Sequence, residues 1–194
     1  EEYPDVRCEL DFGTPLQLLV ATVLSAQTTD VSVNKVTPAL FAKAPDAASM
    51  CMLTEEEIQD HIRAIGLYRN KAKNLLALSK ALQEQYGGEV PGDFARLTAL
   101  PGVGRKTANV VLAEGFGQQQ IAVDTHVFRL ANRIGLTAEK DVLKTELGLQ
   151  KAIPHSKWTL MHHCLILHGR RCCHARGPEC SRCPINEICE KNGL

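Results

Sequence analysis

Hydrophobic positions in this chain recur at the three- and four-residue spacing that is typical of amphipathic α-helices. Together with capping and stop residues, this spacing predicts helices at about 14–24, 30–41, 54–65, 70–86, 93–98, 105–115, 124–134, 139–152 and 156–170. Only the segment 118–123 has the character of a strand, and it is short. The pattern therefore predicts an all-α fold.

Residues that favour helix N-termini support several of these boundaries. Thr14 precedes a proline, which is tolerated in the first helical turn. Thr54 and Glu57 have the spacing of a capping box. Asp30 and Asp124 are expected to cap the helices that follow them.

The size and composition of the chain suit a soluble protein with one domain or two small ones. It has 194 residues, of which 44% are hydrophobic, and no apolar run long enough to span a bilayer. Residues 1–4 resemble neither a signal peptide nor a transit peptide, although an initiator methionine is also missing. We expect a cytoplasmic protein, and the missing methionine indicates either a trimmed chain or a mature form.

The formal net charge of zero hides an uneven distribution. Residues 1–99 carry 9 Lys and Arg against 14 Asp and Glu, whereas residues 100–194 carry 13 against 8. The first half thus has a net charge of −5 and the second +5. This asymmetry either arises by chance or marks a surface that binds phosphate.

The segment from Leu100 to Gly104 reads Leu-Pro-Gly-Val-Gly and lies between two predicted helices. Gly102 and Gly104 permit positive φ and leave the backbone around Val103 uncovered. Amide N–H groups at the start of the next helix can then bind one phosphate of DNA, whatever the base. A plain helix–helix connector is the alternative, but the Arg105-Lys106 pair that follows favours phosphate binding.

Lys106 is placed where a lysine can become a nucleophile. Free lysine has a pKa of about 10.4, so about one in a thousand is neutral at pH 7. Arg105, the helix N-terminus and any partial burial all disfavour the charged ammonium form, which has no lone pair for attack. The alternative is a surface lysine that only binds phosphate.

Four cysteines near the C-terminus have the spacing of a metal centre. Cys173, Cys180, Cys183 and Cys189 are separated by six, two and five residues. Iron–sulfur clusters and zinc both bind four thiolates, but structural zinc sites commonly use two Cys-x-x-Cys pairs, and only one is present. On spacing alone both remain open, with iron–sulfur favoured and Cys172 taken as a non-ligand.

Basic residues surround these cysteines, and Arg170 and Arg176 are the ones we expect to reach DNA phosphates. The other cysteines, at positions 8, 51 and 164, are interpreted as ordinary buried thiols. Histidines along the chain show no convincing metal spacing.

Two motifs together resemble the endonuclease III family of DNA glycosylase/AP lyases. They are the segment 100–109, Leu-Pro-Gly-Val-Gly-Arg-Lys-Thr-Ala-Asn, and the segment 123–126, Val-Asp-Thr-His. Further similarity lies at 24–27, 65–68 and 165–170, and in all it extends from about residue 14 to 189.

The resemblance implies two helical lobes with a DNA-binding cleft between them. One would be a six-helix bundle, 14–117, that carries a helix–hairpin–helix motif. The other, 1–13 plus 118–194, would hold a [4Fe-4S] cluster on the four cysteines. The chain would be a monomeric, nucleoid-associated enzyme of base excision repair, acting on double-stranded DNA with damaged bases or abasic sites.

The resemblance also assigns roles to residues. Lys106 would be the Schiff-base nucleophile and Asp124 the essential carboxylate. Gln27 and Leu67 would enter the duplex beside the extruded nucleotide. The alternatives are ordinary packing for Leu67 and the end of a helix for Gln27. The substrates would be oxidised pyrimidines, with cleavage 3′ to the abasic site by β-elimination.

Two other functions stay open on the sequence. A glycosylase of the same superfamily without lyase activity is disfavoured by lysine at position 106 and by the lack of a further C-terminal domain. A DNA-binding or redox module without enzymatic activity would need only the hairpin and the cysteines.

Overall fold

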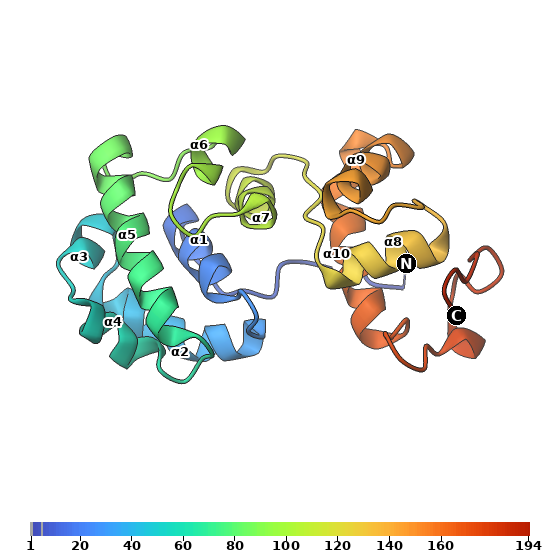
Figure 1. Ribbon diagram of the computed structural model, residues 1–194, viewed down its shortest axis with the longest axis horizontal. Coiled ribbons are helices and arrows are strands. Elements are labelled where there is room, and N and C mark those ends of the chain that lie inside the picture. Colours follow the sequence, from blue (N-terminus) through green and yellow to red (C-terminus); the bar gives the residue numbers. More distant parts are fainter. Residues whose placement is uncertain (1, 5) are drawn as a thin grey trace. The chain divides into compact units, whose positions relative to one another are not determined.

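The computed structural model describes residues 2–4 and 6–194 and divides into two compact units. One is the continuous segment Glu9–Gln118; the other joins the N-terminal residues up to Cys8 to Gln119–Leu194. The described residues contain helices and no strands, so the all-α prediction is confirmed (Figure 1). The domain boundaries given above, at 13/14 and 117/118, stay a prediction.

The continuous unit is a bundle built around one buried helix. Its helices are α1 (Pro15–Leu24), α2 (Asp30–Lys43), α3 (Ala47–Cys51), α4 (Glu55–Ile62), α5 (Tyr68–Tyr86), α6 (Phe94–Thr98) and α7 (Arg105–Phe116). In α1 every residue from Leu18 to Leu24 is buried. This helix packs against α2, α5 and α7, so it forms the centre of the bundle.

Six of these helices were predicted, and the five-residue α3 was not. Asp46 and Ser49 form a capping box at its start, and Met50 is buried. The helix is too short to show a repeating hydrophobic stripe, so periodicity could not reveal it.

The predicted caps are confirmed in three of four cases. Thr14 accepts a hydrogen bond from the Gln17 amide at 3.2 Å, and Thr54 and Glu57 form the capping box of α4. Asp124 caps α8 (Thr125–Ile134). The exception is Asp30, which is the first residue of α2, because Thr29 takes the capping position.

The second unit packs helices around a smaller core. It contains α8, α9 (Val142–Ala152), the 3₁₀ turn η1 (His155–Lys157), α10 (Trp158–Arg171) and the 3₁₀ turn η2 (Cys180–Arg182). Helix α8 packs against both α9 and α10. The predicted strand-like segment 118–123 is an extended connection whose residues Ile121 and Val123 are buried in this core.

The N-terminal residues belong to this second unit. The Tyr3 hydroxyl and Nδ1 of His168 are hydrogen-bonded at 2.8 Å, which ties the chain start to α10. The three scattered cysteines at positions 8, 51 and 164 are half-buried, less than predicted. No helix in the described ranges has both the length and the hydrophobicity to cross a membrane.

Candidate functional site

The turn between α6 and α7 presents backbone amides at a helix N-terminus. Gly102 has φ +76°, and the Val103 amide closes the turn by donating to the Leu100 carbonyl at 3.2 Å. Val103 is buried, whereas Gly102 and Gly104 are exposed. Gly104 is the N-cap of α7 and provides no side-chain cap. The first amides of α7 therefore lack an intrahelical acceptor and can bind an anion.

The two glycines of this turn serve different needs. Gly102 has the left-handed conformation that the sequence led us to expect. Gly104 has φ −90°, which any residue adopts, so the positive φ that glycine permits is not used there. A Cβ at Gly104 would meet no atom within 4 Å, so its lack of a side chain leaves the amide surface open.

Alanine substitutions should separate these two needs. Gly102→Ala places a Cβ at φ +76°, which costs about 1–2 kcal/mol, and sets it 3.4 Å from Asn74. We expect the melting temperature to fall by about 2–8 °C. The matched control Gly104→Ala should lose less, because φ −90° suits alanine and only the preference for glycine over alanine at an N-cap opposes the change. Calorimetry that found equal losses would contradict this account.

Lys106 and Arg105 lie in the first turn of α7, beside these amides. Both side chains are exposed, so the partial burial considered for Lys106 is not found. The Arg105 guanidinium lies 4.7 Å from the centre of the Phe94 ring, a cation–π geometry that orients it. Lys106 is thus a solvent-accessible amine next to an uncapped helix N-terminus.

Asp124 has a geometry that combines a cap with an available oxygen. Its Oδ1 accepts a hydrogen bond from the Val127 amide at 2.8 Å, and its side chain is half-buried. Within the described residues of its own unit, Oδ2 accepts no hydrogen bond. The carboxylate is therefore fixed by one oxygen while the other can face a substrate.

Two α8 residues that sequence analysis did not single out, His126 and Arg129, lie against Gly169 of α10, and Arg129 also bonds to the cysteine-rich segment. Burial lowers the pKa of His126, against the opposing effect of Asp124. Arg129 donates from Nη2 to the Gly169 and Cys173 carbonyls at 3.1 and 3.0 Å. The helix that begins at Asp124 is thereby joined to the first predicted cysteine ligand.

Gln27 and Leu67 share a conformation that is uncommon for residues with side chains. Their φ values are 54° and 60°, and both side chains are exposed, Leu67 to 55%. Left-handed backbone costs a non-glycine residue about 1–2 kcal/mol and persists where surrounding contacts hold it. The sequence predicted that both residues enter the duplex, but it did not predict that they share a strained backbone.

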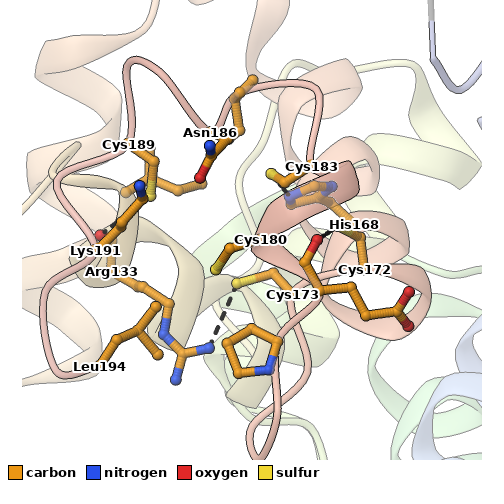
Figure 2. Close-up of a pocket in the computed structure, with 14 residues that line it drawn as sticks. Arg133, His168, Cys172, Cys173, Cys180, Cys183, Asn186, Cys189, Lys191 and Leu194 are labelled. Atoms are coloured by element: carbon orange, nitrogen blue, oxygen red, sulfur yellow. Dashed lines mark hydrogen bonds between the residues drawn. The ribbon is translucent and has the colours of Figure 1, made fainter.

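Five cysteines line one pocket in the second unit. The pocket is lined by Cys172 and by the four predicted ligands, Cys173, Cys180, Cys183 and Cys189 (Figure 2). A set of cysteine sulfurs fits a soft metal centre, whether iron–sulfur or zinc. The residues present therefore suit a metal site.

Arg133 of α8 supports the wall of this pocket. Its Nη1 donates to the Cys173 sulfur at 3.4 Å and to the His174 carbonyl at 2.7 Å. Its carbonyl receives bonds from the Cys189 sulfur and the Asn192 amide. Figure 2 shows the arginine reaching the cysteine sulfur.

The tightest group of donor atoms here differs from the predicted ligand set. His168, Cys172 and Cys183 have donor atoms within 4.8 Å of one another, although neither His168 nor Cys172 was predicted to bind metal. Burial, with the neighbouring Cys183 sulfur, raises the pKa of Cys172 to about 11, which disfavours its thiolate. Arg170 and Arg176, predicted to bind phosphate, are exposed before and within the cysteine-rich loop.

Comparison with known proteins identifies the family. The model of the HhH-GPD superfamily base excision DNA repair proteins matches residues 20–155. Endonuclease III of Escherichia coli (strain K12) is 50% identical over 190 residues, covering 98% of this chain and 90% of the relative. Endonuclease III of Bacillus subtilis (strain 168) is 48% identical over 190 residues, covering 97% and 87%. The chain belongs to the endonuclease III family.

Solved structures agree with this assignment. An endonuclease III trapped as a covalent intermediate with DNA superposes with a TM-score of 0.93 at 47% identity, covering 98% of this chain and 90% of that one. A non-covalent endonuclease III–DNA complex gives the same TM-score and identity. The protein is a bifunctional base excision repair enzyme, a DNA glycosylase with AP lyase activity.

Proposed function

We propose that this endonuclease III removes oxidised pyrimidines and cleaves the strand 3′ to the lesion by β-elimination. The exposed amine of Lys106, beside the uncapped amides of α7, is the observation that carries the proposal. A family member has been trapped in a covalent complex with DNA, which fits an amine nucleophile.

In the proposed reaction, the neutral amine of Lys106 attacks C1′ of the damaged nucleotide. The glycosidic bond breaks, and the base leaves with the bonding electrons and takes up a proton. Loss of a proton from nitrogen and opening of the sugar give a Schiff base at C1′, which acidifies the C2′ proton. Removal of that proton expels the 3′ phosphate, and water then releases Lys106. Asp124 accepts the lysine proton or stabilises positive charge that develops on the sugar.

The DNA contacts follow from the turn and from the exposed basic residues. The first amides of α7, which follow the turn of Gly102, Val103 and Gly104, bind one phosphate, with the Arg105 guanidinium beside them. Arg170 and Arg176 bind further phosphates near the cysteine-rich loop. The nucleotide must leave the base stack, and Gln27 and Leu67 fill the space that it vacates.

We propose that Cys173, Cys180, Cys183 and Cys189 hold a [4Fe-4S] cluster. All four line one pocket, and the Arg133 guanidinium at Cys173 complements a negatively charged thiolate. Cys172, whose thiolate is disfavoured, stays a thiol. Such a cluster chiefly stabilises the loop that carries Arg176.

Removal of one ligand tests this assignment. Cys189→Ser should lose most of the bound iron and the visible absorption of the purified protein, because serine is a poor ligand for this centre. The matched control Cys164→Ser, which alters a half-buried cysteine of α10 outside the pocket, should keep both. Metal analysis that found zinc in place of iron would contradict the assignment. So would a Cys189→Ser variant that kept its iron and its visible absorption.

A nicking assay on defined duplexes tests the substrate class. The protein should cleave duplexes with thymine glycol or an abasic site and leave an undamaged duplex intact. The expected 3′ end is the unsaturated aldehyde of β-elimination. Base release without strand cleavage would favour a glycosylase that lacks lyase activity, and binding without either reaction would favour a DNA-binding module.

Partner, assembly and location complete the proposal. The partner is double-stranded DNA that contains damaged bases or abasic sites, as the DNA complexes of relatives suggest. The enzyme acts as a monomer in the cytoplasm, associated with the nucleoid.

A further inference from the structure

Lys71 is a buried lysine that takes no part in the proposed glycosylase and lyase reaction. Its exposed fraction is 5%, whereas every other lysine in the described residues is exposed. Lysine is almost never fully buried unless its charge is paired. Burial alone lowers the pKa of Lys71, and within residues 2–4 and 6–194 no acidic side chain forms a salt bridge with it. A group that is costly to bury and lacks an ion pair points to a specific role.

The contacts of Lys71 join two turns that are distant in sequence. Its amide donates to the Leu67 carbonyl at 3.0 Å, in the first turn of α5. Its Nζ donates to the Thr28 hydroxyl at 2.6 Å, in the turn between α1 and α2. Helix side chains point back toward the N-terminus, which directs this ammonium toward the preceding turns.

Each of these turns presents one of the two exposed residues in left-handed backbone. Gln27 immediately precedes Thr28, and Leu67 is the N-cap of α5. Only one further non-glycine residue in the described part of the chain, Lys191, has a positive φ. Conformations of this kind persist when neighbouring contacts determine them, and Lys71 supplies a contact to both turns.

We propose that Lys71 is a positioning residue that holds the Gln27 turn and the Leu67 turn at a fixed spacing for joint insertion into the duplex. The inference rests on the proposed roles of Gln27 and Leu67. Gln27 and Leu67 must enter the base stack at the same time, because either side chain alone leaves part of the space vacated by the nucleotide unfilled. The Lys71 backbone amide is bonded to the Leu67 turn and its side chain to the turn that follows Gln27, so this one residue couples their positions.

The experiment measures unstacking directly and separately from catalysis. Lys106→Ala serves as the background, and 2-aminopurine is placed next to an abasic site in a duplex saturated with protein. Insertion should raise the fluorescence of this base by reducing its stacking. Lys71→Met keeps most of the side-chain volume and removes the ammonium, while Thr28→Val removes the partner hydroxyl. Lys80→Met, an exposed lysine of the same helix, is the matched control.

We expect Lys71→Met and Thr28→Val to lower the fluorescence rise at least twofold, as Gln27→Ala/Leu67→Ala does, and Lys80→Met to preserve it. Adding Lys71→Met to Gln27→Ala/Leu67→Ala should cause little further loss. With Lys106 restored, kcat/KM on the abasic duplex should fall about tenfold while the melting temperature is kept or raised, since methionine is less costly to bury.

Two outcomes would overturn the inference. The first is a normal rise in fluorescence in both Lys71→Met and Thr28→Val. The second is a loss of fluorescence in Lys71→Met that adds fully to the loss caused by Gln27→Ala/Leu67→Ala. Should Lys71→Met fail to fold, Thr28→Val alone decides, because it leaves the lysine in place. A wild type that cleaves the abasic duplex keeps the proposed function intact in either case; a wild type that cleaves nothing refutes that function instead.

Discussion

Lys106→Ala is expected to abolish the covalent adduct that borohydride traps between the wild-type protein and abasic DNA. A positioned nucleophile reaches effective molarities of about 10⁵–10⁸ M, so its removal should slow strand cleavage by about 10⁴-fold or more. Adduct formation is measured by denaturing electrophoresis of labelled DNA. Duplex affinity should change far less, because the amides of α7 remain.

The control for this variant is another exposed lysine at the start of a helix. Lys144 lies in the first turn of α9, as Lys106 does in α7, and both side chains are exposed. Lys144→Ala should form the borohydride-trapped adduct with DNA to the same extent as the wild type. Persistence of the adduct in Lys106→Ala would assign the nucleophile to another amine and reduce Lys106 to a phosphate contact.

Asp124→Asn should lose turnover while the fold and DNA affinity are kept. Asparagine is as good an N-cap as aspartate, so its oxygen can still accept from the Val127 amide. Only the negative charge is lost, and with it the proposed proton acceptor for Lys106. Groups in this role contribute about 10²–10⁴-fold, which is the expected fall in kcat.

Asp141 offers the matched comparison, because it caps α9 through the Lys144 amide at 3.0 Å in the same geometry. Asp141→Asn should leave kcat unchanged. Asp124→Ala should in addition destabilise the protein by about 0.5–2 kcal/mol through loss of the cap. Full activity of Asp124→Asn would show that the carboxylate only caps its helix.

Local signals explain why much of the fold was predictable. Thr14, Thr54 and Asp124 each cap a helix through an amide three residues away, so the information lies within one turn of chain. The rule fails at Asp30 because Thr29 satisfies it one residue earlier. Helix α3 could not be predicted, because five residues are too few to show a helical period.

The parts of the site that could not be predicted depend on contacts between distant segments. Lys71 lies in a polar stretch of α5 that reads as solvent-exposed, and its partner Thr28 is 43 residues away. His168 has no metal-like spacing, yet its Nε2 lies 3.4 Å from the Cys183 sulfur. The left-handed backbone at Gln27 and Leu67 has no sequence signal, because neither residue type favours it.

The discontinuity of the second unit has a consequence for biosynthesis. Chains are made from the N-terminus and domains generally fold as units, so the bundle of Glu9–Gln118 can form as soon as it leaves the ribosome. Tyr3, by contrast, must wait for His168 before it finds its hydrogen-bond partner. Because Cys189 is translated after the whole bundle, a nascent chain completes the proposed phosphate-binding turn before it contains all four proposed cluster ligands.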